Sequence, residues 1–274
     1  MGRPQDPGSR PMHPFDRGIA VTRQGEGSYR GTVSADWSIN ENPNGGYLMA
    51  LCAQAALEQS RMPSLSIFTA AFLSRCAPGE AEITVGPLGA SARFERCRVD
   101  LFQQGELKTT ALGTFTHRGS RSATNRMEAE APALPPVEAC VPIPEMPGYT
   151  LFRHLDVRLD PACAGWMSGE PAERSEIRGW IRFQDDRPLD ERALLLLADA
   201  FPPAVLASQG MVAWVPTLEC SVNVRQAPQS AWLKGRFRSR FVHQGMVEED
   251  GELWDETGAL IALSRQIAQF RKAG

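Results

Sequence analysis

The segment Phe72-Leu-Ser-Arg-Cys-Ala-Pro78 has a counterpart later in the chain, Val222-Asn-Val-Arg-Gln-Ala-Pro228. Arg75 matches Arg225, and the Ala-Pro pairs that follow match at the same offset of 150 residues. The sequence around the two segments also runs in parallel. A chain of 274 residues is long enough for two ordinary domains. The repeat therefore predicts two units of one architecture.

The first unit has the pattern of one long helix followed by antiparallel strands. Tyr47–Glu58 is rich in Ala and Leu and has no Gly or Pro, which predicts a largely buried helix. Asn44 is the predicted N-cap, because its side chain can accept from the free amides of a first helical turn. The predicted strands cover residues 67–75, a segment that starts at 82, and the hairpin 94–103 and 106–117, which turns at Gln104-Gly105.

The second unit repeats this pattern with a helix over 191–206, which Pro202-Pro203 should kink or end. Strands are predicted over 155–159, 177–183, 214–225, 233–242 and 259–271, with turns at Asp250-Gly251 and Thr257-Gly258. The expected fold class is α+β: in each unit a long helix is wrapped by a curved antiparallel sheet, and the sheets join side by side, which covers an open edge of each. The expected divisions are a disordered tail over 1–18, a first unit over 19–118, a linker rich in proline over 119–150, and a second unit over 151–274.

Composition excludes several classes of function. The net charge of −3 gives no electrostatic reason to expect nucleic acid or an anionic membrane as partner. The six cysteines form no CxxC pair and there are only four histidines, so we expect neither a zinc site nor another metal site. The polar start carries no secretory signal, Met12 is a second candidate start, and no apolar run reaches the ~18 residues that span a bilayer. Reduced thiols in the cytoplasm are the expectation.

Asn44-Gly45-Gly46-Tyr47-Leu48 opens the first predicted helix, and Phe72-Leu73 is followed by Pro78-Gly79 before the next predicted strand. These segments resemble the bacterial acyl-CoA thioesterase II family, which has a double hotdog fold: the first looks like the start of a hotdog helix, and the second is similar to the approach to the family's next strand. Further similar segments follow in the right order, so that the resemblance covers most of residues 28–272: Trp180-Ile181-Arg182, Leu197-Ala-Asp199 and Ala262-Leu-Ser-Arg-Gln266.

The resemblance implies an enzyme that hydrolyses acyl-CoA with an activated water and no cofactor, and that associates further into a homo-oligomer. In that family an Asp, a Thr and a Gln activate the water, and these roles fall on Asp199, Thr217 and Gln266. The chain departs from the family pattern at Thr69, where a His is usual nearby, and at Leu218-Glu219-Cys220-Ser221, where Ile-Asp-His-Ser is usual. These departures bear on substrate preference and rate.

The residues themselves fit this chemistry. Asp199 lies in the apolar run Leu194–Phe201, where burial would raise the pKa of a carboxylate towards that of a useful base. Gln266 is one amide on a mostly apolar strand face, and its counterpart in the first unit is Gly113, so the sequence favours one active centre in the second half. The alternatives are an exposed helix turn for Asp199, a sheet edge for Gln266, and an ordinary strand threonine at Thr217, with Ser221 as the substitute.

Other candidate sites have two interpretations each. Asn44, Gly45 and Gly46 would form an oxyanion or CoA contact through free helix amides, or simply a turn and cap. Arg236, Arg238 and Arg240 would meet CoA phosphates or cover a solvated sheet face, and the latter is favoured. His117 and His243 are expected at the surface. Competing functions are a hotdog hydratase or dehydratase, which needs a His near a helix start, and a non-catalytic acyl-CoA or lipid-binding protein.

Overall fold

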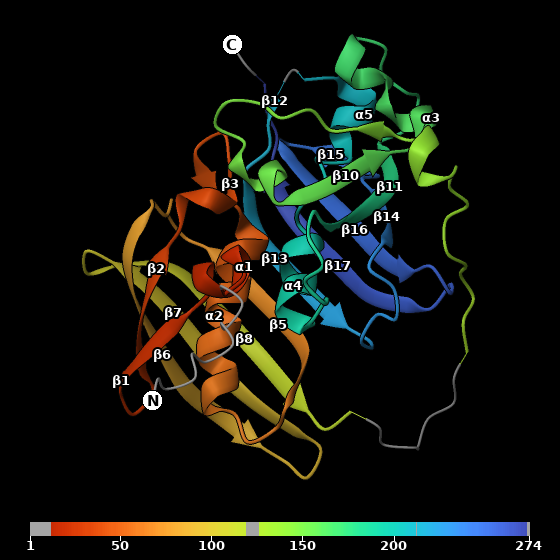
Figure 1. Cartoon of the computed structure of the whole chain (residues 1–274). Coiled ribbons are helices and arrows are strands. Elements are labelled where there is room, and N and C mark those ends of the chain that lie inside the picture. Colours follow the sequence, from red (N-terminus) through yellow and green to blue (C-terminus); the bar gives the residue numbers. More distant parts are fainter. Residues whose placement is uncertain (1–11, 119–125, 212, 273–274) are drawn as a thin grey trace, which may run out of the picture.

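The computed structural model describes residues 12–118, 126–211 and 213–272, and its centre is one long antiparallel sheet. The first unit contributes one half of this sheet and the second unit the other half, and the helices α2 (Gly45–Gln59) and α4 (Glu191–Leu197) pack against each other in front of the strands in the view of Figure 1. The architecture is that of two fused hotdog units, as the sequence predicted. In order across the sheet, the strands are β1, β2, β6, β7, β8, β5, β13, β17, β16, β14, β11, β10 and β9.

The first unit supplies six strands of this sheet and the second unit eight. In the first unit these are β1 (Val21–Gly25), β2 (Ser28–Val33), β5 (Ser64–Phe72), β6 (Gly79–Ala90), β7 (Phe94–Gln103) and β8 (Glu106–Thr116). In the second they are β9 (Val141–Pro142), β10 (Leu155–Leu159), β11 (Glu176–Phe183), β13 (Thr217–Val224), β14 (Leu233–Arg238), β16 (Met246–Asp255) and β17 (Leu260–Gln269), with β15 (Val242–His243) beside β16. The small pairs β3 (Ser38–Ile39) with β4 (Asn42–Pro43), and β12 (Ala213–Trp214) with β18 (Arg271–Lys272), lie outside this sheet.

The long helix of the first unit, α2 (Gly45–Gln59), confirms its prediction. The Asn44 side chain accepts a hydrogen bond from the Tyr47 N–H at 2.9 Å, so Asn44 is the N-cap. Nearly the whole circumference of α2 is buried, because β5 to β8 cover one side and α4 (Glu191–Leu197) packs against the other. The helix with the Ala-rich composition is therefore the one enclosed by the sheet.

The helix predicted over 191–206 is shorter than expected. It ends at Leu197, and Asp199 lies in the turn that follows, with its N–H bonded to the Leu196 carbonyl. A second short helix, α5 (Val205–Gln209), starts after Pro202-Pro203, which cannot continue the helical hydrogen bonding. Other helices and 3-10 turns are peripheral: α3 (Pro161–Ala164), η1 (Ala35–Trp37), η2 (Val137–Ala139), η3 (Thr150–Arg153) and η4 (Gly165–Ser168).

The two units join through the pairing of β5 with β13. Across this seam Thr69 faces Ser221, and their hydroxyl oxygens are hydrogen-bonded at 2.8 Å. One contiguous set of buried residues also runs through both units, from Phe15 and Trp37 to Phe237. The sheet and the core therefore cross the boundary between the units, and neither unit is a separate body.

The register of the seam corrects the offset of the repeat. Both seam strands end with the same hydrogen bond: the Leu73 N–H donates to the Lys108 carbonyl, and the Arg225 N–H donates to the Ile261 carbonyl. Leu73 is thus the counterpart of Arg225, at an offset of 152 residues, whereas the Arg-x-Ala-Pro match aligned Arg75 with Arg225. The repeat pointed to the right pair of strands but slipped by two residues.

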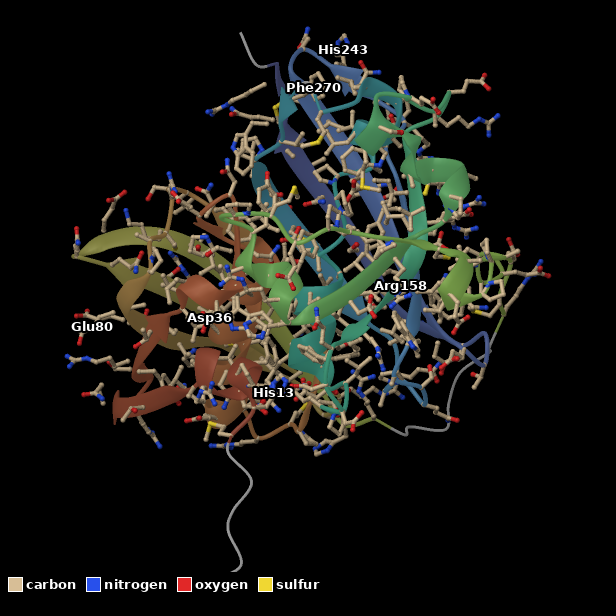
Figure 2. The ribbon with its side chains drawn as sticks, turned by 45° about the horizontal axis from the view of Figure 1, so that its top comes forward. His13, Asp36, Glu80, Arg158, His243 and Phe270 are labelled. Carbon is tan, nitrogen blue, oxygen red and sulfur yellow. The ribbon has the colours of Figure 1, made fainter. Side chains whose placement is uncertain are left out.

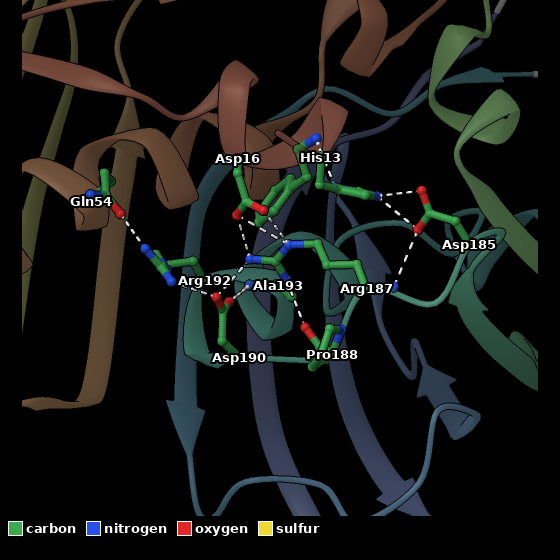
Figure 3. Close-up of polar contacts among 10 residues, drawn as sticks. His13, Asp16, Gln54, Asp185, Arg187, Pro188, Asp190, Arg192 and Ala193 are labelled. Atoms are coloured by element: carbon green, nitrogen blue, oxygen red, sulfur yellow. Dashed lines mark hydrogen bonds and ion pairs between the residues drawn. The ribbon is translucent and has the colours of Figure 1, made fainter. Parts of the chain in front are cut away.

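The expectation of a disordered tail over residues 1–18 is wrong for Met12–Gly18; residues 1–11 lie outside the described residues. Pro14–Gly18 forms the helix α1, and Phe15 is fully buried against Trp37. This segment also binds the second unit (Figure 3): His13 meets Asp185 at 2.7 Å, and Asp16 meets Arg187 at 2.7 Å.

The polar contacts at α1 extend to the helices α4 and α2. Arg187 also binds Asp190, the N-cap of α4, at 2.6 Å. Two residues further along, Arg192 reaches from α4 to Gln54 on α2. The guanidinium of Arg187 lies over the ring of Phe15 at 4.8 Å. The start of the described chain therefore helps to fix α4 relative to α2.

Three further expectations for the second unit need correction. Asp250-Gly251 is no turn but lies inside β16, and Gly251 is needed there because an added Cβ would lie 2.5 Å from the ring of Phe237. The strand predicted over 214–225 splits at Val215-Pro216 into β12 and β13. Part of the predicted linker belongs to the sheet, since Val141–Pro142 pairs with β10, while residues 119–125 lie outside the described residues.

Candidate active site

Asp199 lies where the end of α4 meets the start of α2. Its Oδ2 accepts a hydrogen bond from the Gly46 N–H at 2.8 Å and another from the Asn44 side-chain amide at 3.0 Å. The same amide of Asn44 also donates to the Asp199 carbonyl at 2.8 Å. The first turn of a helix has free N–H groups and a partial positive charge, so it is a favourable place for a carboxylate.

A glycine at position 46 allows this close approach of the two helices. A Cβ on Gly46 would lie 2.4 Å from the Leu195 carbonyl oxygen and 2.9 Å from the Asp199 Cβ. For Asn44, Gly45 and Gly46 the sequence left open an oxyanion or CoA contact and an ordinary turn and cap. In the free protein the donors of Asn44 and Gly46 are directed at Asp199, and their contact with a substrate stays a prediction.

The carboxyl group of Asp199 is tuned towards neutral pH. Burial raises its pKa from the ordinary 3.8 to about 6, although the Gly46 N–H, the Asn44 amide and the Gly45 N–H act in the opposite direction. At pH 7 the group is therefore mostly ionised, yet it is a far stronger proton acceptor than an exposed aspartate. The alternative of an exposed helix turn is excluded, because the side chain is partly buried and satisfied by α2.

Thr217 and Gln266 lie together at the start of β13 and in β17. The Thr217 hydroxyl donates to the Gln266 Oε1 at 2.9 Å. Gln266 faces Cys220 across the strands, and Gly113 faces Phe68 in the first unit; Phe68 and Cys220 are related by the same offset of 152. Gly113 is therefore the counterpart of Gln266, as predicted, and the first unit has no amide at this position.

A buried carboxylate that the sequence did not point to, Glu249 on β16, also belongs to this group. The Gln266 Nε2 donates to the Glu249 Oε1 at 2.6 Å, and the Ala204 N–H donates to the Glu249 Oε2. Glu249 is only 6% exposed, and burial raises its pKa from the ordinary 4.5 to about 7. The pattern that marks it is the alternation of buried residues along β16, where Val247, Glu249 and Leu253 face inward.

One cavity of about 880 Å³ brings the candidate residues together. Its wall includes polar groups from both units and many apolar side chains. The polar candidates are Asn44, Gly45, Asp199, Thr217, Glu249 and Gln266, and the apolar lining includes Leu48, Phe72, Phe152, Trp166, Phe201 and Leu206. Gly46 does not line the cavity, but its N–H binds the carboxylate of Asp199, which does. A deep apolar cavity with a few convergent polar groups is typical of a small-molecule site.

Other predicted residues lie elsewhere. Ser221 is engaged with Thr69 at the seam and does not line the cavity. His117 and His243 are exposed, and His243 lies with Phe270 at one end of the molecule in Figure 2. The favoured interpretation of the arginine stripe is confirmed, because it is ion-paired on the outer face of the sheet: Arg236 and Arg238 with Glu252, and Arg240 with Asp250.

Two negative findings apply to the described residues. Over 12–118, 126–211 and 213–272, no group of three His, Cys, Asp or Glu side chains could hold a metal ion. In the same ranges no helix is both long and apolar enough to cross a membrane. All six cysteines are buried free thiols.

Comparison with known proteins gives a consistent assignment for both halves. Residues 33–116 match the family model of the acyl-CoA thioesterase N-terminal domain, and residues 137–270 match that of the C-terminal domain. An uncharacterized protein of Mycobacterium tuberculosis is 27% identical in an alignment 267 positions long, which covers 88% of this chain and 90% of that protein.

Solved structures with the same fold cover nearly the whole chain. A chain from Thermobifida fusca assigned to thioesterase II superimposes with a TM-score of 0.85 at 27% identity, over 93% of this chain and 98% of that one. The acyl-CoA thioesterase II TesB2 of Mycobacterium marinum gives a TM-score of 0.74 at 19% identity, over 95% and 99%. At this lower identity the likeness concerns the fold.

Proposed function

Because the chain belongs to the acyl-CoA thioesterase family through both of its domains, we propose that it hydrolyses an acyl-CoA thioester to a free carboxylic acid and CoA. One observation carries the proposal beyond family membership: Asp199, Thr217 and Gln266 border a single cavity, and the pKa of Asp199 is raised to about 6. A buried base whose pKa lies near the working pH, beside one hydroxyl group and one amide group, is suited to activating a water molecule.

In the proposed reaction Asp199 is the general base. The oxygen of a water held between Asp199, Thr217 and Gln266 attacks the carbonyl carbon of the thioester, and one proton of that water passes to the carboxylate. The tetrahedral adduct then collapses, the bond between carbon and sulfur breaks, and the proton on Asp199 passes to the departing thiolate. The products are the carboxylic acid and the CoA thiol, and Asp199 is ionised again.

Charge on the carbonyl oxygen needs a donor during this reaction. The Gln266 Nε2 carries two hydrogens, and Glu249 accepts only one of them at 2.6 Å. The second hydrogen of this amide is our proposed donor to the developing oxyanion. Such donors stabilise the adduct most where water is excluded.

The cavity also fits the two parts of an acyl-CoA. Its apolar walls, with Leu48, Phe201 and Leu206, suit an acyl chain. Arg75 and Arg271 border the same cavity and would offer positive charge to the phosphates of CoA. On this proposal the acyl chain lies in the interior, and the nucleotide part stays near the arginines.

Thiol release from a panel of acyl-CoAs tests the function. Purified protein should liberate CoA thiol, detected with a thiol reagent, from at least one of the short, medium, long and aromatic acyl chains. Asp199→Asn should lower kcat by about 10²-fold or more, because the amide cannot accept the water's proton at neutral pH. Asp186→Asn, in an exposed loop, is the matched control and should keep the wild-type kcat.

Two outcomes would contradict the proposal. No thiol release from any acyl-CoA, with tight binding of the same ligands by calorimetry, would favour the non-catalytic acyl-CoA-binding alternative. An unchanged kcat in folded Asp199→Asn would remove Asp199 from the role of base. The hydratase alternative finds no support in the described residues, since no histidine lines the cavity there.

A further inference from the structure

Glu249 is the least expected group in the cavity wall, because it is a buried carboxylate that pairs with no cation among the described residues. The charged neighbours that affect it are two other carboxylates, Asp199 and Glu248. Its two oxygens are instead satisfied by the Ala204 N–H and the Gln266 side-chain amide. Burial of an unpaired carboxylate costs free energy, so such a group calls for a functional reason.

The direction of the hydrogen bonds around Glu249 is fixed at one end. The Ala204 N–H is a backbone donor, so the Glu249 Oε2 must accept from it. An ionised Glu249 offers only acceptors, and it therefore draws the NH₂ of Gln266 towards itself. The Gln266 Oε1 is then left facing Thr217, whose hydroxyl must donate to it.

This direction decides what Thr217 can offer to a water. With its hydrogen bound to Gln266, the Thr217 oxygen can only accept, so it takes one O–H of the water and leaves the lone pairs of the water free to attack. A protonated Glu249 would donate to the Gln266 Oε1 instead, and the amide would turn over. The Thr217 hydroxyl would then be free to donate to the water oxygen, which engages the lone pair needed for attack.

We propose that Glu249 is a positioning residue of the thioesterase, which acts through Gln266 to set the direction of hydrogen bonding at Thr217 and so orients the attacking water. This inference rests on the proposed function for its catalytic consequence. The chain from Glu249 to Gln266 to Thr217 itself is a matter of contacts, at 2.6 and 2.9 Å.

The groups around Glu249 place its change of protonation near neutral pH. Burial raises its pKa to about 7, with Asp199 and Glu248 raising it further and the Ala204 N–H and Gln266 lowering it. Cys220, which faces Gln266 across the strands, is also buried; the pKa of its thiol is raised well above the ordinary value, so it stays neutral. Glu249 and Asp199 are thus the two groups of the site that titrate near neutrality.

The first unit has no such series of hydrogen-bonded side chains. Cys97 faces Gly113 there, as Glu249 faces Gln266 in the second unit, and Gly113 is the counterpart of Gln266. The carboxylate and the amide are therefore both particular to the second unit. The fold itself does not need this pair, because the first unit has a cysteine and a glycine at the corresponding positions. A joint function of Glu249 and Gln266 is the better explanation.

Glu249→Gln is the direct test, because the change is isosteric and reverses the direction of the hydrogen bonds that run from Thr217 through Gln266 to residue 249. The Ala204 N–H will hold the new side-chain oxygen, so the new NH₂ faces Gln266 and forces its amide to turn over. We expect kcat to fall about tenfold with KM within a factor of about two, since the water is misdirected but the cavity is intact. Glu249→Asp, which keeps the acceptor, should retain more of kcat than Glu249→Gln.

The pH profile separates positioning from a merely structural role. In wild type the acid side of log kcat should reflect two groups, near 6 and near 7, and in Glu249→Gln only the group near 6. The matched control is Glu219→Gln, an exposed carboxylate on β13, which should leave both kcat and the profile unchanged. A wild-type kcat and a wild-type profile in folded Glu249→Gln would overturn the proposal.

A second readout does not depend on turnover. In protein labelled with ¹⁵N at glutamine, the side-chain NH₂ resonances of Gln266, assigned from Gln266→Leu, should shift with a midpoint near 7 in wild type and stay constant in Glu249→Gln. A titration without thioesterase activity would sink the proposed function and leave the coupled pair standing. Resonances that do not move, or that move alike in both proteins, would sink the pair itself.

Discussion

At the scale of single residues, the balance of forces on Asp199 sets the chemistry that the site can perform. Loss of hydration opposes ionisation, and the donors at the start of α2 favour it; the first wins, so the pKa settles at about 6. A fully exposed aspartate would be too weak a base, and a buried one without donors would stay protonated. The helix start thus keeps the carboxylate usable at neutral pH.

The raised pKa of Asp199 predicts how stability depends on pH. The folded protein holds this proton more tightly than the unfolded chain, with a pKa of about 6 against 3.8. The stabilising effect is therefore complete below the unfolded pKa and is lost as pH rises through the folded one. Relative to wild type, Asp199→Asn should gain about 2 kcal/mol in free energy of unfolding between about pH 4 and about pH 7.

Urea unfolding at several pH values measures this difference. Asp186→Asn, whose side chain is exposed, should run parallel to wild type over the same range. A difference between Asp199→Asn and wild type that stays constant with pH would contradict the burial of an ionisable group at this site.

Asp199 and Gln266 could be anticipated from the sequence, because each is a polar residue within an apolar pattern. Glu249 was missed, because Glu248-Glu249-Asp250-Gly251 has the composition of a turn and this hid the alternation of the strand. Only the bounds of β16 reveal that Glu249 points inward while its acidic neighbours point outward. The face of a strand residue depends on parity, and parity is lost when the ends of the strand are unknown.

At the scale of elements, the approach of α2 to α4 is the feature on which the site depends. The Gly46 backbone lies against the Leu195 carbonyl, and this contact brings the free amides of α2 to Asp199. Composition predicted α2 well, because a run of Ala and Leu has few alternatives. It overextended the second helix, which ends at Leu197, before Pro202 and before the turn that carries Asp199.

Gly46→Ala should separate the two helices. A methyl group 2.4 Å from the Leu195 oxygen cannot be accommodated without movement, so we expect a loss of about 1–3 kcal/mol in stability. Loss of the Gly46 N–H contact should also raise the pKa of Asp199 and lower kcat. Thermal unfolding and thiol release measure the two effects. Gly86→Ala, on an exposed part of β6 with no atom within 4 Å of the added Cβ, is the control, and equal effects in both variants would contradict this account.

At the scale of the whole molecule, the two units are joined by a strand seam, a shared hydrophobic core and a network of side-chain ion pairs. The seam pairs β5 with β13, the buried cluster crosses it, and α1 reaches from the first unit to Arg187 in the second. The repeat predicted two units and their approximate relation. It could not reveal the role of residues 13–16, because their partners lie some 170 residues away.

This continuity predicts a single unfolding transition. Since each unit covers an edge of the other, neither should persist once the seam opens. Calorimetry should give one peak with equal calorimetric and van't Hoff enthalpies, and fluorescence should follow the same curve as circular dichroism. Two separated transitions, one for each unit, would show that the seam contributes little to stability.

The seam also has a consequence for biosynthesis. β5 leaves the ribosome some 145 residues before β13, so the nascent first half has an uncovered strand edge, and α1 and the adjoining His13 lack their partners Arg187 and Asp185. An unpaired edge of nine residues is a template for pairing with other chains, including another nascent copy of itself. A fold that is one body when finished is therefore most vulnerable halfway through translation, and its yield in cells depends on how quickly the second half follows the first.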